Sequence, residues 1–291
     1  MPFVTTPTLK IAYETGGPAG GTPVLLLHGW PDDVRTYDRV LPALHDAGFR
    51  TIAPFLRGFG ETSFLSKDTP RSGEMVAMTQ DAIDLMDALK VDRFAVIGHD
   101  WGARIAYALA IVVPARVTRM VTLAVGWQPG PLPTPGLRQA QAYWYQWFMA
   151  TDRGRDLVRR DGKAFARLQW DNWSPPGWFD DATFEETAKA FENPDWPAIV
   201  WHSYSVRWGE ADKDPRYAEL DRRTLAAQTI AVPTLMIQGG ADAVTLPEST
   251  AGRDKYFTGG YERRVIPGVG HFPTREAPAA VSKLVVEFLK K

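Results

Sequence analysis

Short apolar runs alternate with longer runs of helical period at both ends of the chain. The strand-like runs are residues 8–15, 23–28, 49–54, 94–98, 117–125, 232–238 and 263–266. The helical runs are residues 34–47, 74–90, 101–113, 247–257 and 279–289. Strands that alternate with helices form a layered structure around a parallel sheet. The pattern therefore predicts an α/β fold with a mostly parallel sheet flanked by helices.

The first strand-like run differs from the others because it alternates apolar and polar residues. It covers residues 8–15 and ends in a turn rich in glycine and proline at residues 16–21. Such a turn between two strand patterns is typical of an antiparallel pair. We therefore expect residues 8–15 to form a hairpin with the buried strand at residues 23–28.

The middle of the chain breaks the alternation. Four prolines at positions 129, 131, 133 and 135 make a stiff segment that cannot continue a central strand, and aromatic-rich, mostly helical sequence follows. Strands and helices then resume near residue 232. We predict one α/β core, residues 1–127 and 229–291, interrupted once by a helical cap at residues 128–228.

Composition excludes several classes of function. The 33 Lys and Arg residues balance 34 Asp and Glu residues, so the chain lacks the basic surface that nucleic-acid binding requires. The longest apolar run, residues 105–113, is too short to span a bilayer, and the N-terminal sequence lacks the features of a signal peptide. These features predict a soluble, cytoplasmic protein, either a monomer or a homodimer.

The residue types that hold metals and cofactors are sparse. The chain has no cysteine and five histidines, none of which form an i, i+4 pair. No segment matches a glycine-rich dinucleotide or phosphate loop. We therefore expect neither a metal ion nor a cofactor.

The strongest candidate for chemistry is the segment Gly98-His99-Asp100-Trp101-Gly102, between a predicted strand and a predicted helix. This spacing is typical of a nucleophile elbow, where the middle residue sits on a strained turn and small residues flank it. The middle residue here is Asp100. An aspartate before a helix is also a common N-cap, so a capping role is the alternative.

Three other segments follow predicted strands at the same edge of the sheet. His28-Gly29-Trp30-Pro31 follows the strand at residues 23–28, Asp242 follows the strand at residues 232–238, and His271 follows the last strand. Each has a simple structural alternative, such as a strand-end histidine or an Asx turn. The candidate nucleophile Asp100, the acid Asp242 and the histidine His271 follow one another along the chain in the order that is typical of an α/β-hydrolase.

Together these motifs resemble the α/β-hydrolase fold family, and specifically its aspartate-nucleophile branch of epoxide hydrolases and haloalkane or haloacid dehalogenases. The resemblance covers essentially the whole chain. It implies that Asp100 attacks a saturated carbon, that His271 activates the water that hydrolyses the resulting ester, and that Asp242 orients His271. The backbone N–H groups of Trp30 and Trp101 would form the oxyanion hole.

The cap decides between an epoxide and a halide as the reacting group. An alkoxide leaving from an epoxide needs a proton donor, whereas a halide needs only weak N–H donors. Tyr145 and Tyr204 resemble the two ring-opening tyrosines of epoxide hydrolases, although Ser205 stands where the family often has arginine. The structural alternative for both tyrosines is a packing role. The sequence therefore predicts an epoxide hydrolase that forms vicinal diols.

Other functions remain open at this stage. Trp101 and Trp147 resemble halide-binding tryptophans, and Arg104 falls where haloacid dehalogenases have one of two carboxylate-binding arginines. Trp101 stands where the second arginine would be, which disfavours that reading. An esterase or lactonase is disfavoured because an aspartate attacking an ester would form an anhydride. A ligand-binding protein without turnover is the non-enzymatic alternative.

Tryptophan is concentrated in the predicted cap. Nine of the eleven tryptophans lie between positions 127 and 208. Pockets for small molecules are lined mainly by apolar and aromatic side chains, so we expect a small hydrophobic substrate. The residues predicted to contact it are Trp101, Gln146, Trp147 and His28.

Overall fold

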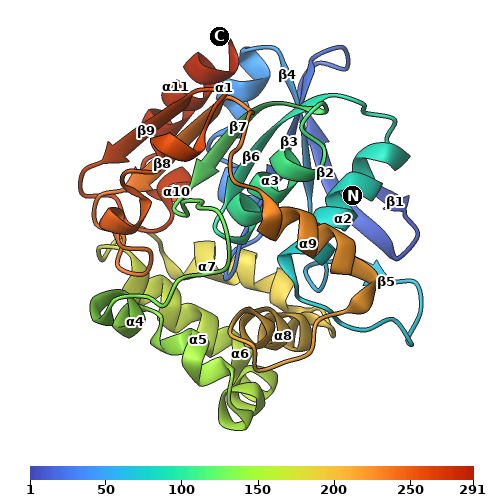
Figure 1. Ribbon diagram of the computed structural model, residues 1–291, viewed down its shortest axis with the longest axis vertical. Helices are drawn as coiled ribbons and strands as arrows, with labels where there is room; N and C mark the ends of the chain where they lie inside the picture. The colour runs from blue at the N-terminus through green and yellow to red at the C-terminus, as the bar shows by residue number, and fades with distance from the viewer.

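The computed structural model describes residues 1–291 and is built around a nine-stranded sheet (Figure 1). The strands are β1 (Phe3–Thr5), β2 (Leu9–Gly16), β3 (Thr22–Leu27), β4 (Phe49–Pro54), β5 (Ser63–Phe64), β6 (Phe94–His99), β7 (Val117–Leu123), β8 (Thr234–Gly239) and β9 (Tyr261–Ile266). They follow the order β1-β2-β4-β3-β6-β7-β8-β9, with β5 paired to β2. The six strands from β4 to β9 along this order are parallel. The predicted mostly parallel sheet is confirmed.

The central strands are apolar because helices cover both of their faces. Every residue of β6 and β8 is buried, and their sequences lack the alternation of a half-exposed strand. The edge strand β9 is only partly buried and has charged residues. Since the inner strands are parallel, their carboxyl ends meet at one edge of the sheet, and the loops that leave this edge can bring distant residues together.

Two helical layers cover the sheet. The helices are α1 (Leu41–Asp46), α2 (Met75–Ala88), α3 (Trp101–Val112), α10 (Pro273–Glu276) and α11 (Pro278–Leu289). α1 packs with α11, and α2 packs with α3, on opposite sides of the sheet in Figure 1. No helix combines the length and the apolar character needed to cross a membrane.

Six helices lie between β7 and β8, in the interval that we interpret as the cap. They are α4 (Leu137–Ala142), α5 (Trp144–Met149), α6 (Asp152–Trp173), α7 (Asp181–Ala188), α8 (Trp196–Arg207) and α9 (Ala218–Ala226). α4, α5, α6 and α8 lie together below the sheet in Figure 1, and α5, α6 and α8 pack against one another. α9 instead packs on α3. The predicted cap interval thus includes one helix that rests on the core.

Three local predictions were wrong. The predicted hairpin is absent, because β2 pairs antiparallel with β4, and β3 lies between β4 and β6. The predicted helix at residues 34–47 is split into a 3-10 turn at Val34–Tyr37 and the short helix α1, which has Pro42 in its first turn. Proline favours the start of a helix, where its missing N–H costs nothing.

The predicted helix at residues 247–257 forms only two 3-10 turns, Pro247–Thr250 and Asp254–Tyr256.

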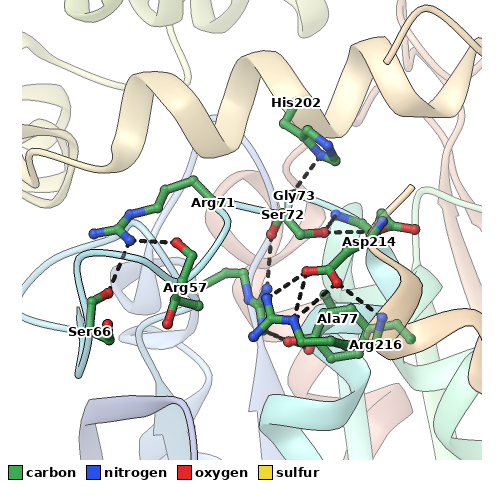
Figure 2. A network of polar contacts seen from close by, with 12 residues as sticks. Arg57, Ser66, Arg71, Ser72, Gly73, Ala77, His202, Asp214 and Arg216 are labelled. Atoms are coloured by element: carbon green, nitrogen blue, oxygen red, sulfur yellow. Dashed lines mark hydrogen bonds and ion pairs between the residues drawn. The ribbon is translucent and has the colours of Figure 1, made fainter. Parts of the chain in front are cut away.

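A buried arginine joins the core to the segment that leads into α9. The Arg57 guanidinium donates to both carboxylate oxygens of Asp81 at 2.6 and 2.7 Å, and to Tyr217 Oη at 3.1 Å. It also donates to the backbone oxygens of Ser72 and Ala77 (Figure 2). All of these donors are satisfied in a nearly inaccessible position, so the charge of Arg57 depends on its partners.

The same region is tied to α8. The backbone N–H of Gly73 donates to His202 Nδ1 at 3.0 Å, and the N–H of Asp214 donates to Glu74 Oε2 at 2.8 Å. Figure 2 shows His202 reaching down from α8 toward Gly73, with Asp214 beside Arg216. The segment before α2 therefore connects to two separate parts of the predicted cap interval.

We expect Asp81→Asn to lower the free energy of unfolding by about 3–5 kcal/mol, because it leaves the buried charge of Arg57 without its counterion. Urea unfolding followed by circular dichroism measures this loss. Asp87→Asn is the matched control on the same helix. Asp87 pairs with Arg116 on the surface, so its loss should cost less than about 1 kcal/mol. Equal losses in the two variants would contradict the prediction.

Candidate active site

The elbow between β6 and α3 presents Asp100. Its backbone has a φ of +52°, in the left-handed region. A Cβ at Gly102 would lie 1.9 Å from the backbone oxygen of Leu27, and one at Gly98 would lie 2.1 Å from the oxygen of Gly102. Gly98 is therefore required for the turn itself to close, and Gly102 is required for the turn to pack against β3.

The Asp100 side chain turns away from its own helix. It makes no capping hydrogen bond to α3 and instead accepts the backbone N–H of Trp30 at 3.1 Å through Oδ1. Its other oxygen, Oδ2, lies 3.8 Å from His271 Nε2. The geometry thus disfavours the capping alternative and favours the predicted role as a nucleophile, because the carboxylate faces a histidine.

His271 is oriented by Asp242, as the predicted triad requires. Nδ1 lies 2.9 Å from Asp242 Oδ2, while Asp242 Oδ1 accepts the backbone N–H groups of Val244 and Thr245. With the Nδ1 proton donated to Asp242, the Nε2 lone pair faces Asp100. Nε2 is buried and has no hydrogen-bond partner. The imidazole is therefore placed to accept a proton at Nε2.

The charge state of His271 reflects two opposing effects. Burial disfavours the imidazolium, but the carboxylates of Asp242 and Asp100 favour it more strongly and raise the pKa of His271 above its usual value. The neighbouring His99 has no such carboxylate contact, and burial together with the charge of His271 lowers its pKa. The two histidines therefore differ in their readiness to bind a proton.

The backbone around His271 is held by a small polar cluster. Glu276 accepts the N–H groups of Gly270 at 2.6 Å and Phe272 at 2.8 Å, and the hydroxyl of Ser174 at 2.6 Å. The Ser174 oxygen in turn accepts the N–H of His271 at 2.9 Å. Ser174 follows the last residue of α6, so the predicted cap supports the loop of the predicted base.

Tyr145 and Tyr204 lie side by side on α5 and α8. Their ring centroids are 5.3 Å apart, and both side chains are buried. Gln146 Nε2 donates to Tyr145 Oη at 2.7 Å, and Trp101 Nε1 donates to Tyr204 Oη at 3.2 Å. Because each oxygen accepts an N–H, its own proton is free for another acceptor.

Both phenols stay protonated at neutral pH. Burial raises the pKa of Tyr145 and of Tyr204, and the nearby carboxylate of Asp100 raises both further. Trp30, whose backbone N–H binds Asp100, packs its ring against both tyrosines, and Trp101, the residue after Asp100, donates to Tyr204, so both phenols lie near the carboxylate. The structure thus brings the five predicted catalytic residues, Asp100, Asp242, His271, Tyr145 and Tyr204, to one site.

The predicted oxyanion donors lie on either side of Asp100. The N–H of Trp30 already points at the carboxylate, and Trp101 is the first residue of α3, where N–H groups lack intrahelical acceptors. The Trp30 ring packs against both tyrosines, at centroid distances of 5.6 Å to Tyr145 and 5.4 Å to Tyr204. The role of these N–H groups in the reaction stays a prediction.

The residues predicted to contact substrate fall into two groups. Trp101 and Trp147 line a cavity of about 680 Å³. Gln146 is buried and positions Tyr145, while its Oε1 accepts Trp208 Nε1. His28 is fully buried, and its Nε2 accepts the N–H of Leu56 while its Nδ1 contacts the oxygen of Gly29. Both ring nitrogens of His28 therefore contact backbone groups, which favours the structural alternative over a contact with substrate.

Burial also controls the charge of His28, lowering its pKa to about 4. The imidazole thus stays neutral and can accept the Leu56 N–H. The sequence motifs did not indicate Ser174 or Glu276. Glu276 lies five residues after His271, which was a weak signal, but Ser174 is 97 positions away and gave none.

Comparisons with known proteins agree with this geometry. Residues 22–278 match the family model for the alpha/beta hydrolase fold. The structure of a candidate epoxide hydrolase from Klebsiella pneumoniae subsp. pneumoniae MGH 78578 is similar, with a TM-score of 0.93, 39% identity, and coverage of 100% of this chain and 97% of that chain. Epoxide hydrolase A of Mycobacterium tuberculosis is 26% identical over 99% of this chain and 96% of its own length. An epoxide hydrolase of Caballeronia sordidicola is 27% identical, and the similarity covers 97% of this chain and 91% of that protein.

Proposed function

Since the chain belongs to the alpha/beta hydrolase fold family, we propose that it hydrolyses epoxides to vicinal diols through an ester of Asp100. The observation that carries this proposal is the pair of buried phenols beside a carboxylate that faces a histidine. A carboxylate nucleophile suits a saturated carbon, and phenol protons suit an oxygen leaving group. Relatives with full-length similarity are named epoxide hydrolases, which agrees with this reading.

In the first step, Asp100 Oδ2 attacks one epoxide carbon and the C–O bond of the ring breaks. The electron pair of that bond stays on the oxygen, which takes a proton from Tyr145 or Tyr204. A phenol is a suitable donor because a phenol O–H is intrinsically a stronger acid than the alcohol that forms. The product of this step is a hydroxyalkyl ester of Asp100.

In the second step, His271 Nε2 takes a proton from water while the water oxygen attacks the ester carbonyl carbon of Asp100. The N–H groups of Trp30 and Trp101 stabilise the oxyanion that forms, each contributing roughly 2.7–4 kcal/mol in comparable sites. Collapse of this intermediate breaks the Cγ–O bond to the substrate, and the imidazolium gives its proton to the departing oxygen, which completes the diol. The carboxylic acid left at Asp100 returns its proton to the tyrosinate formed in the first step, so both groups regain their starting state. Asp242 stabilises the imidazolium meanwhile.

The two phenols supply the test of the leaving group. We expect Tyr145→Phe and Tyr204→Phe each to slow diol formation from styrene oxide about 10- to 100-fold, and the double variant about 10²- to 10⁴-fold, the range for general acid catalysis. Diol is measured by chromatography. Halide release from 1-chlorobutane and chloroacetate is measured on the same enzymes.

Tyr13→Phe, on β2, is the control and should leave diol formation unchanged. Halide release by the wild type at a rate comparable to diol formation, together with diol formation that is insensitive to both Tyr→Phe variants, would instead favour a dehalogenase. Loss of diol formation with unchanged halide release would tie the phenols to epoxide opening.

The second step should depend on pH because His271 accepts a proton only when neutral. Nearby carboxylates raise its pKa, so more of the imidazole is charged near neutrality than for a free histidine. Below this pKa the rate of ester hydrolysis should fall about tenfold per pH unit. Rapid quenching and intact-mass measurement between pH 5 and 9 should show the ester accumulating at the acidic end. An ester level independent of pH would contradict the role of His271.

A further inference from the structure

A large cavity adjoins the candidate active site. It has a volume of about 680 Å³ and is lined in part by residues of α3, α8 and α9. Trp101 and Tyr204 belong to its lining, so it meets the site at the residue after Asp100 and at one of the catalytic phenols. Apolar side chains such as Val76, Leu132 and Trp147 form much of the remaining wall. The cavity therefore has room for the part of a substrate that extends beyond the epoxide.

Two arginines in this wall have no counterion. Arg104 lies in the first turn of α3, and Arg207 is the last residue of α8. Both line the cavity, and the buried Nε atom of each has no hydrogen-bond partner. Neither guanidinium is among the ion pairs of the protein, whereas Arg57 and Arg275, the two buried arginines, each hold a carboxylate.

The acidic groups in the cavity wall are engaged elsewhere. Glu74 accepts the hydroxyl of Ser72 and the N–H of Asp214, both at 2.8 Å. Asp221 pairs with Lys213 at 2.5 Å. The lining thus contains two guanidiniums that no protein carboxylate neutralises.

The charge of Arg104 also acts on Arg207. Burial and the charge of Arg104 lower the pKa of Arg207 to about 10, and no carboxylate is among the groups that offset them. The rings of Tyr143 and Trp208, 5.8 and 5.4 Å from the Arg207 guanidinium carbon, stabilise its charge but fill none of its N–H donors. An anion between the guanidiniums would satisfy both, since a carboxylate accepts paired N–H donors from arginine.

We propose that the natural substrate is an epoxide that also bears a carboxylate, which Arg104 and Arg207 bind in the cavity while the epoxide reaches Asp100 beyond Trp101 and Tyr204. This inference rests on the proposed epoxide hydrolysis and specifies its substrate class. The apolar wall suits a hydrocarbon spacer between the two groups. The sequence around Arg207 does not indicate this role, because Arg104, the other arginine of the proposed site, is 103 positions away in the chain.

The test compares charged and neutral forms of one substrate. Terminal epoxides of carboxylic acids with spacers from butanoate to undecanoate are assayed beside their methyl esters. We expect the wild type to have a kcat/KM about 10- to 100-fold higher for the best acid than for its ester, the range for hydrogen bonds to a charged group. Arg207→Met and Arg104→Met should each reduce this acid-to-ester ratio about tenfold or more. A general loss of activity lowers kcat/KM for the acid and for the ester alike, so it leaves this ratio unchanged.

Arg160→Met, an exposed arginine on α6, is the matched control and should leave the ratio unchanged. Arg207→Lys keeps the positive charge but loses the paired N–H donors of the guanidinium, and we expect it to retain part of the preference for the acid. This partial retention would show that the loss in Arg207→Met does not come from misfolding. A wild-type ratio near one, or equal loss for acid and ester in both Arg→Met variants, would overturn the proposal.

A binding measurement separates this inference from the proposed function. Calorimetry with undecanoate, which has no epoxide, should show binding to the wild type that weakens about 10- to 100-fold in Arg207→Met, and methyl undecanoate should show no such difference. If undecanoate binds in this way but no epoxide is opened, the proposed reaction fails and the carboxylate site stands. If neutral epoxides are opened but undecanoate binding is unaffected by the substitution, the carboxylate site fails.

Discussion

Asp100→Asn is expected to reduce diol formation by about four orders of magnitude or more, because an amide cannot displace the epoxide oxygen. Binding should persist, since the Trp30 N–H still has an oxygen to bind at this position. No mass increase should appear on the protein after incubation with epoxide. The measurements are chromatography of the diol and intact-mass analysis of the protein at matched times.

Isotope labelling gives the same prediction an independent readout. In a single turnover in H₂¹⁸O, water attacks the Asp100 carbonyl carbon, so the label should enter Asp100 and the first diol should be unlabelled. A labelled first diol would indicate direct attack by water and would refute the ester. Asp87→Asn, a surface acid on α2, is the control and should keep full activity. If Asp100→Asn recovers activity with time, the protein should gain about one dalton as the amide is hydrolysed back to aspartate. Recovery without this mass gain would mean that another group is the nucleophile.

His271→Gln is expected to stop turnover after the first step. Asp100 and both tyrosines remain, so the epoxide should still open, but no group accepts the proton of the attacking water. We expect the protein to gain the mass of one substrate molecule and the steady rate to fall about three to four orders of magnitude. Peptide mapping should place the added mass on Asp100.

Formation of the adduct also shows that this variant is folded, because an unfolded chain would not assemble the ester. Asp242→Asn should give a milder form of the same result, since the imidazole remains but loses the carboxylate that orients it. An inactive His271→Gln protein without any adduct would mean that the imidazole is needed before the ester forms, contrary to the mechanism.

The parallel core and the elbow could be predicted from sequence because their signals are local. The buried strands are short apolar runs, and Gly98 and Gly102 mark a turn that other residues cannot form. The positions of Asp100 and His271 followed from their places after strands. Parallel strands bring such positions to one edge whatever the distance between them in the chain.

The antiparallel edge could not be predicted in the same way. β2 has a turn immediately after it, which favours the next strand as its partner, yet it pairs with β4. The partner of β2 depends on the position of β3, which is buried between its parallel neighbours β4 and β6. The sequence of a single strand does not indicate which strands lie beside it. The same limit applies to Ser174 and Arg207, whose surroundings come from helices distant in the sequence.

The hydrogen bond from the His271 backbone N–H to the Ser174 oxygen has a consequence for recombining this protein with its relatives. Ser174 and Glu276 hold the loop jointly, although one follows α6 and the other lies in α10. A chimaera that exchanges the inserted helices alone would separate these two supports and leave the imidazole poorly aligned. Functional chimaeras should therefore inherit both residues from one parent.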